Sequence, residues 1–426
     1  MDRANGLQAE SRSRTRCGPL EYTTFLISSA VIAIHVLDDS FVQPEAGTSA
    51  GDHIVSGIVP LAALAVAALG YPRTRPGVRA TIALVVGLFG MVTGAEGWYY
   101  TIAVGASGDD YTSLVAPVAG IALIVLATVT LWRSRRTDDS RPWRYLRRRL
   151  IGVLGLSVAV FVVRPFVETY GHTHVARAVV PEADLGGAAY EDVTFETSDG
   201  LELAGWYIPS KNRAAVIAIT GRKLPRAAAA FLARNGYGVL LFDRRGEGES
   251  EGDPNSFGWG GVKDIDAAVA YLRGRPDVDS DRIGGFGLSV GGEMLIEAAA
   301  ETDGLKAVVS EGAGIRSVRE ALELRGVEKW LRLPTWAAAT LGTSIFSNHP
   351  PPPNLKHLIG RIAPRPVFLI YAEQGVSGEH LSAEYHEVAG EPKQLWRTDS
   401  GHTGGYAADP EEYERRVLQF FDAALG

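Results

Sequence analysis

The segment RIGGFGLSVGGEMLIEAAA, residues 282–300, decides the fold expected for the second half of this chain. Arg282–Leu288 is a short apolar run typical of a buried strand, and Gly291–Ala300 has the composition of a helix. Ser289 stands at the turn between them, in the motif Gly287-Leu288-Ser289-Val290-Gly291. Glycines permit a tight, strained turn, so we expect the serine hydroxyl to stand clear of the sheet as a nucleophile. The alternative is a small-residue turn around a buried serine.

Strand-like and helix-like segments alternate on both sides of this motif, from Tyr190 to the end of the chain. A hairpin is expected around Ser198-Asp199-Gly200. The alternation predicts an α/β fold with a mostly parallel sheet that helices cover on both faces. It breaks between residues 313 and 362, where we expect a cap or lid, or else irregular packing. The further predicted strands are Ala214–Thr220, Tyr237–Phe242, Lys306–Glu311, Pro366–Tyr371 and Pro392–Thr398.

A nucleophilic serine needs a base, and His402 is the best placed histidine. It lies in Ser400-Gly401-His402-Thr403-Gly404, after the last predicted strand and before the closing helix. The other histidines after residue 190 fall in the predicted cap or on the helix after Glu379. The backbone N–H of Val290, at a helix N-terminus, is a candidate donor to an oxyanion.

Residues 190–426 resemble the α/β-hydrolase family, especially its dienelactone-hydrolase and serine-aminopeptidase-like branches. The resemblance rests on LFDRRGEGES (residues 241–250), on the turn at Ser289, and on the His402 loop followed by Pro410-Glu411-Glu412-Tyr413. It implies a triad of Ser289, His402 and an acid after the Pro366–Tyr371 strand. It also implies a second oxyanion donor after the Ala214–Thr220 strand, where the backbone N–H of Arg222 is the candidate.

The triad acid departs from the pattern of this family. The resemblance implies an aspartate about four residues beyond the strand end, and Gly375 stands there in this chain. Glu379 is favoured because it follows Ser377-Gly378 and can sit at a helix start, directed toward the His402 loop. Glu373 is the runner-up, and a third possibility makes both of them surface carboxylates. Asp243 is expected to organise its own turn rather than to take part in catalysis.

The resemblance implies acyl transfer to water through an acyl-enzyme on Ser289, with no metal or organic cofactor. The first expected substrate is a small carboxylic ester, followed by an amide or short peptide. The alternatives are an acyltransferase or serine peptidase with the same triad, and an inactive hydrolase-like binding module on a membrane sensor or transporter. The net charge of -7 and the lack of basic, aromatic-rich patches argue against nucleic acid as a partner. Cys17 is the single cysteine, which excludes an intrachain disulfide and a cysteine-based metal site.

Residues 1–171 contain apolar runs separated by short charged loops, and they predict an all-α transmembrane region ahead of a linker at 172–189. A spanning helix needs about 20 mostly apolar residues. Buried helices of a soluble protein are the alternative, although the repetition of the pattern favours membrane spans. The predicted spans are Tyr22–Leu37, Ile54–Tyr71, Ala80–Ala95, Ser113–Trp132 and Leu150–Val163.

Arginines cluster before the first run, between the second and third, and between the fourth and fifth, whereas the other loops carry aspartates. This bias predicts a cytoplasmic N-terminus and, after five crossings of what we expect to be the cell membrane, a hydrolase domain on the extracytoplasmic side. Arg164 and Pro165 follow the fifth run closely, and the domain would be cytoplasmic if that run only lay on the surface. His35 and Glu96 are expected to be solvated near the outer interface, with a functional role as the alternative.

Overall fold

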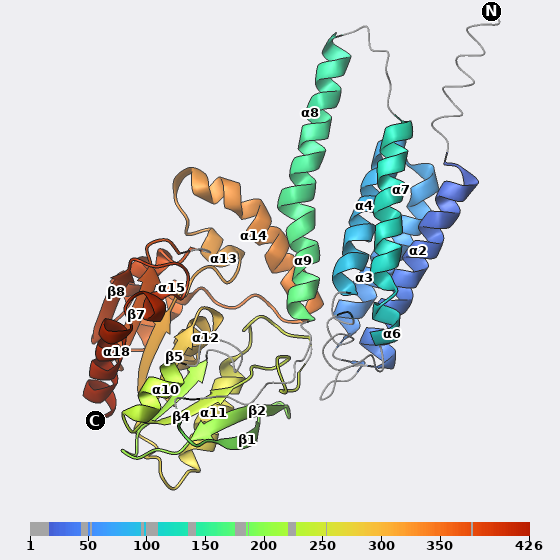
Figure 1. Ribbon diagram of the computed structural model, residues 1–426. Coiled ribbons are helices and arrows are strands. Elements are labelled where there is room, and N and C mark those ends of the chain that lie inside the picture. The colour runs from blue at the N-terminus through green and yellow to red at the C-terminus, as the bar shows by residue number, and fades with distance from the viewer. Residues whose placement is uncertain are drawn as a thin grey trace, which may run out of the picture. The chain divides into compact units, whose positions relative to one another are not determined.

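The computed structural model describes residues 17–43, 50–51, 53–94, 98, 110–134, 142–174, 185, 187–219, 227–252, 254–375 and 378–426. The chain divides into two compact units, coloured along the sequence in Figure 1. The helical unit comprises Met1–Ala176 and Ala337–Asn348. The α/β unit comprises Arg177–Trp336 and His349–Gly426.

The α/β unit is built on an eight-stranded sheet with the order β1-β2-β4-β3-β5-β6-β7-β8. β1 and β2 form the predicted antiparallel hairpin, with Phe195 opposite Leu203, and β2 also pairs antiparallel with β4. All pairings from β4 through β8 are parallel, which confirms the mostly parallel sheet predicted from the sequence. The strands are β1 Glu191–Glu196, β2 Glu202–Ile208, β3 Ala215–Ile219, β4 Gly238–Phe242, β5 Ile283–Leu288, β6 Ala307–Glu311, β7 Val367–Ala372 and β8 Lys393–Thr398.

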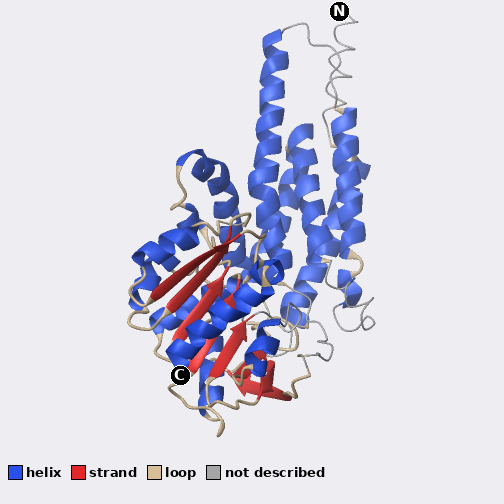
Figure 2. Ribbon diagram, turned by 60° about the vertical axis from the view of Figure 1, so that its left-hand side comes forward, coloured by secondary structure: helices blue, strands red, loops and turns tan. Residues whose placement is uncertain are grey.

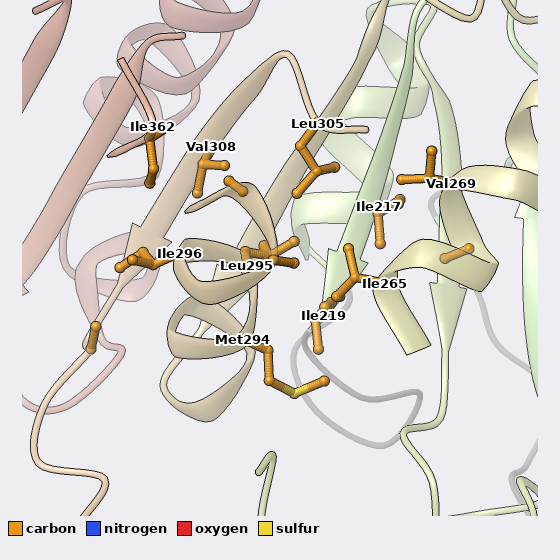
Figure 3. Packing of buried hydrophobic residues seen from close by; sticks show 14 of the residues in the cluster. Ile217, Ile219, Ile265, Val269, Met294, Leu295, Ile296, Leu305, Val308 and Ile362 are labelled. Atoms are coloured by element: carbon orange, nitrogen blue, oxygen red, sulfur yellow. The ribbon is translucent and has the colours of Figure 1, made fainter. Parts of the chain in front are cut away.

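Helices cover both faces of this sheet (Figure 2), because each central strand is apolar on both sides. Alternate residues of β3 contribute to two separate cores: Ile217 to one, and Val216 to the other. The first core contains residues of α11 (Val262–Arg273) and α12 (Val290–Glu301), and Figure 3 shows Met294, Leu295 and Ile296 of α12 packed in it. The second core contains residues of α10 (Ala227–Arg234) and α18 (Pro410–Leu425). The short helix α17 (Gly405–Ala408) precedes α18, and α16 is Leu381–Val388.

The segment between β6 and β7, predicted as a cap, is mainly helical. It contains α13 (Val318–Ala321), α14 (Gly326–Phe346), α15 (Leu355–Leu358) and the short 3₁₀ helix η4 (Ile359–Arg361). A capping box of Ser317 and Glu320 begins α13. The helix α14 is shared: its residues up to Trp336 belong to the α/β unit, and those from Ala337 onward belong to the helical unit.

The helical unit contains five helical segments that are long and apolar enough to cross a membrane. They are Pro19–Val42, Ile54–Arg73, Pro76–Thr93, Tyr111–Arg133 and Leu150–Thr173. The corresponding elements are α2 Pro19–Leu37 with η1 Asp38–Val42, α3 Ile54–Gly70 with η2 Tyr71–Arg73, α4 Pro76–Thr93, α6 Asp110–Ser113 with α7 Ala116–Arg133, and α8 Pro142–Val158 with η3 Ala159–Val163 and α9 Arg164–Thr173.

The fifth segment does not end at Arg164 and Pro165, where the sequence pattern placed its limit. Pro165 lies in the first turn of α9, a position that needs no backbone N–H, so the helical path continues to Thr173. The segment Leu150–Thr173 therefore has 24 residues, enough to span the hydrocarbon. Arg164 is exposed and pairs with Glu168 at 2.6 Å.

The helices of this unit pack closely through small residues, as is common between membrane helices. A Cβ atom on Gly120 of α7 would lie 2.6 Å from the carbonyl oxygen of Gly87 of α4, so only glycine allows this approach. His35 is buried, with Nε2 2.9 Å from the carbonyl oxygen of Thr93, so the expected solvation of His35 is wrong. Glu96 and residues 175–184 and 186 of the predicted linker lie outside the described residues.

Candidate active site

Ser289 occupies a sharp turn between β5 and α12, as the sequence motif predicts. Its backbone has φ 51° and ψ −121°, a conformation that residues with a Cβ rarely adopt. Two backbone hydrogen bonds hold it: the Ser289 N–H donates to the carbonyl of Glu311 at 2.7 Å, and the Glu293 N–H donates to the carbonyl of Ser289 at 3.2 Å. Strain of this kind persists only where the surrounding structure over-determines the conformation, which is a feature of functional sites.

The two glycines of the motif are required by close backbone approach. A Cβ atom on Gly291 would lie 2.1 Å from the carbonyl oxygen of Ile219 in β3. A Cβ atom on Gly287 would lie 2.4 Å from the carbonyl carbon of Gly291. Any side chain at either position would therefore push α12 away from the sheet and displace Ser289.

His402 lies within hydrogen-bond distance of Ser289. It follows β8 in the loop that leads to α17, and its Nε2 is 3.0 Å from Ser289 Oγ. This distance suits transfer of the hydroxyl proton to the imidazole. The two residues are 113 positions apart in the sequence. Because β5 to β8 are paired in parallel, the C-terminal ends of β5 and β8 lie at the same edge of the sheet.

Glu379 contacts the other nitrogen of the same ring. Its Oε1 forms a short hydrogen bond with His402 Nδ1, and its Oε2 accepts a hydrogen bond of 3.0 Å from the backbone N–H of Ala372. The carboxylate is 1% exposed, so water does not compete for these bonds. Glu379 follows Gly378, whose φ of 81° turns the chain just before α16.

Gly375 leaves the space that the Glu379 carboxylate occupies. A Cβ atom on Gly375 would lie 2.6 Å from the carboxyl carbon of Glu379. The longer side chain thus reaches the region that an aspartate at position 375 would fill. Glu373, the runner-up acid, has a side chain that is 53% exposed and pairs with Arg397 at 3.6 Å, so the structure does not bring it to His402.

The pKa of His402 is raised above its ordinary value of 6.5. The main cause is the hydrogen bond with Glu379, and the negative charges of Glu293 and Glu311 act in the same direction. Burial of the ring opposes them by disfavouring the charged form. The imidazole is therefore a stronger base than a free histidine.

Glu311, at the end of β6, was not singled out by sequence reasoning. Its Oε1 accepts a hydrogen bond of 2.9 Å from the Gly405 N–H, and its Oε2 accepts one of 2.5 Å from the Tyr413 hydroxyl. Burial raises the pKa of this carboxyl. Because Gly405 closes the loop that carries His402, Glu311 anchors that loop to the sheet beside the serine. The one feature of the sequence that could have pointed to Glu311 is its position at the C-terminal end of a predicted strand.

Of the two candidate oxyanion donors, the structure describes Val290 but not Arg222. Val290 is the first residue of α12, and the first four N–H groups of a helix have no intrahelical acceptor. Its N–H can therefore serve an oxyanion on Ser289. Arg222 lies outside the described residues.

Asp243 accepts a hydrogen bond of 3.2 Å from the Glu249 N–H, so it organises its own turn as predicted. Among the described residues, no group of His, Cys, Asp and Glu side chains is arranged to hold a metal ion.

Residues 155–398 match the family model described as X-Pro dipeptidyl-peptidase (S15 family). The match covers more than half of the 426-residue chain. The chain belongs to this S15 peptidase family. The S15 match and the sheet order confirm the α/β-hydrolase resemblance at the level of the superfamily, and they make the chain a hydrolase by family. The finer branches named from the sequence stay a prediction.

The S15 chain also matches individual proteins over part of its length. The uncharacterized protein YfhR of Escherichia coli K12 is 25% identical over 251 residues, which cover 55% of this chain and 81% of that protein. Rv2307c of Mycobacterium tuberculosis is 38% identical over 129 residues, which cover 29% of this chain and less than half, 45%, of that protein. The thiohydrolase aneE of Aspergillus aculeatus is 36% identical and is matched over 28% of this chain and 41% of its own length.

Solved structures that resemble the S15 chain include an esterase of Pyrococcus furiosus, Pf2001. The two chains are 26% identical, with a TM-score of 0.48 and coverage of 59% of this chain and 98% of the esterase. GrgF of Penicillium is 23% identical, with a TM-score of 0.47 and coverage of 56% of this chain and 99% of GrgF.

Proposed function

We propose that this protein is a membrane-anchored serine hydrolase that cleaves a carboxylic ester or a related acyl bond through an acyl-enzyme on Ser289. The single observation that carries the proposal is the chain of contacts from Ser289 Oγ to His402 Nε2, at 3.0 Å, and from His402 Nδ1 to the buried Glu379. Nucleophile, base and orienting acid in this order are the arrangement of serine hydrolases.

In the proposed reaction, Ser289 Oγ attacks the substrate carbonyl and His402 Nε2 takes the hydroxyl proton. The Val290 N–H holds the negative charge that develops on the carbonyl oxygen. Glu379 keeps the proton of the neutral ring on Nδ1 and stabilises the imidazolium without accepting its proton. His402 then protonates the leaving group, and the same ring activates the water that hydrolyses the acyl-enzyme.

A fluorophosphonate probe tests this proposal directly, because it reacts with an activated serine. We expect it to label the wild-type chain in membranes and to leave Ser289→Ala and His402→Ala unlabelled. Folding of each variant is checked by its thermal unfolding in detergent. A folded wild-type chain that did not react would refute the proposal and favour the inactive binding module.

Membrane anchoring is supported by the five apolar helical segments of the helical unit. The arginine-rich loops and the continuous fifth segment support a hydrolase domain on the extracytoplasmic side. In intact cells, a membrane-impermeant maleimide should modify Glu373→Cys in a Cys17→Ser background. Modification only after lysis would place the domain in the cytoplasm.

A serine peptidase is the second candidate, and the family match favours it. The same serine, histidine and acid would attack an amide carbonyl, and His402 would protonate the leaving amine. Parallel assays with p-nitrophenyl esters and X-Pro p-nitroanilides separate the two substrates. Faster cleavage of the anilide, abolished by Ser289→Ala, would make peptide the substrate class. The thiohydrolase relative makes a thioester a third acyl donor for the same panel.

A further inference from the structure

Helix α14, drawn in orange in Figure 1, carries exposed apolar side chains along one face. Val327, Trp330 and Leu331 are 73%, 71% and 66% exposed, and Leu341 further along is 56% exposed. Their spacing puts them on one face of a helix with 3.6 residues per turn. The exposed Pro334 and Ala337 complete the same face. A solvent-facing side of a helix normally carries polar residues, so this stripe requires an explanation.

The opposite face of α14 is well packed, so the exposure of the stripe does not come from a loosely held helix. Leu333 and Trp336 pack against the first core of the α/β unit. In the helical unit, Phe346 is 2% exposed and belongs to the hydrophobic core. The helix is thus held along its inner side, and the stripe stays on the outer side.

The last turns of α14 pack at the ends of two membrane-span candidates. Phe346 stacks on Phe89 of α4, with ring centroids 6.4 Å apart, and meets Tyr170 of α9 edge-on at 5.3 Å. Phe89 and Tyr170 both lie near the C-terminal ends of their segments, Pro76–Thr93 and Leu150–Thr173. These are the third and fifth segments, which run in the same direction if each segment crosses the bilayer. Their C-terminal ends then lie at the same membrane face, and α14 ends at that face.

Basic side chains border the apolar stripe. Arg325 just before α14, and Lys329 and Arg332 within it, fall within two turns of Val327 and Leu331, and Glu323 and Glu328 are the acids of the same stretch. The Arg325 side chain is 84% exposed and lies 3.7 Å from Glu384, and the Arg332 side chain is 46% exposed and pairs with Glu328 at 2.9 Å. A helix with tryptophan and leucine on one face and basic residues beside them is typical of helices that lie in the surface of an anionic bilayer.

We propose that α14 lies in the boundary between headgroups and acyl chains of the bilayer. Val327, Trp330 and Leu331 enter the hydrocarbon, while the neighbouring arginines and lysine contact lipid phosphates. The bilayer is favoured over a second protein because the stripe combines tryptophan and leucine with flanking basic residues, and because α14 from Ala337 onward belongs to the helical unit that holds the membrane-span candidates. This inference rests on the proposed membrane anchoring but not on the chemistry at Ser289, and its test does not measure activity.

The full chain in nanodiscs of phosphatidylcholine and phosphatidylglycerol provides the test. In a Cys17→Ser background, Leu331→Cys carries an NBD fluorophore, and Val327→Cys provides a second position on the stripe. Asp281→Cys is the matched control, since the Asp281 side chain is 82% exposed on the α/β unit. Doxyl-labelled lipid reports contact with acyl chains, and iodide reports contact with water.

We expect doxyl lipid to quench both stripe positions by about twofold or more and to leave the control unchanged. Iodide should quench the stripe positions about threefold less than the control. Equal quenching by iodide at all three positions would overturn the proposal. Protection from iodide without quenching by doxyl lipid would overturn it as well, since a protein surface, such as a second copy of the chain, would then cover the stripe.

Discussion

Replacing Glu379 by glutamine separates the charge of this side chain from its shape. The backbone N–H of Ala372 is a fixed donor to Glu379 Oε2 at 3.0 Å. In the Glu379→Gln variant the amide oxygen must accept that bond, so the amide NH₂ faces His402 Nδ1. An NH₂ group there requires an unprotonated Nδ1, which moves the ring proton to Nε2, opposite Ser289. The imidazole then cannot accept the serine proton.

The wrong tautomer costs about 10⁴-fold in kcat when the geometry of a triad is otherwise intact. At about 1.36 kcal/mol for each factor of ten, the barrier rises by roughly 5.4 kcal/mol. Hydrolysis of p-nitrophenyl butyrate by the full chain in nanodiscs measures the loss, and thermal unfolding checks that the variant is folded. Glu373→Gln is the matched control, because its exposed carboxylate contacts Arg397 and not His402.

We expect Glu373→Gln to retain the wild-type rate within about twofold, as a surface substitution should. If Glu379→Gln kept more than about a tenth of the activity, the amide would have to orient its oxygen toward the imidazole, and the argument from Ala372 would be refuted. If Glu373→Gln lost activity equally, the assignment of the triad acid would fail.

Three further predictions follow from the same geometry. Activity requires neutral His402, so kcat/KM should rise with pH through the raised pKa of this ring, with its acidic midpoint above 6.5; a midpoint below that value would contradict the hydrogen bond with Glu379. Gly375→Asp should restore about tenfold or more of the activity that Glu379→Ala loses, because the vacated space then admits an aspartate; no recovery in a folded double variant would refute this. Gly291→Ala should abolish stable folding or fluorophosphonate labelling, since its Cβ would clash with a β3 carbonyl oxygen. Gly401→Ala should be tolerated, because a Cβ there has no heavy atom within 4 Å. If the two variants labelled and unfolded alike, this prediction would be contradicted.

Sequence patterns determined those features that depend on near neighbours along the chain. The run from Arg282 to Ala300 predicts a strand, a tight turn and a helix because an apolar stretch, small turn residues and helix-forming residues follow one another within it. The apolar runs predict long helices for the same local reason. His402 could be selected because its loop lies between the last strand and the closing helix. The ends of the apolar helices could not be predicted as well, because Pro165 is compatible with a helix that continues to Thr173.

Tertiary structure decided which of the remaining candidate groups meet. Glu373 and Glu379 both follow β7, and the local sequence favoured Glu379 without excluding Glu373. The path of the loop and the space beside Gly375 bring Glu379 to His402 and leave Glu373 exposed. Glu311 became recognisable only when Gly405 and Tyr413, about a hundred residues later, were seen to share its carboxylate. The division of α14 between two units is equally non-local, because each half packs on partners from another part of the chain. A side chain's neighbours in sequence set its backbone conformation, whereas its burial and hydrogen-bond partners come from segments that only the folded chain brings together.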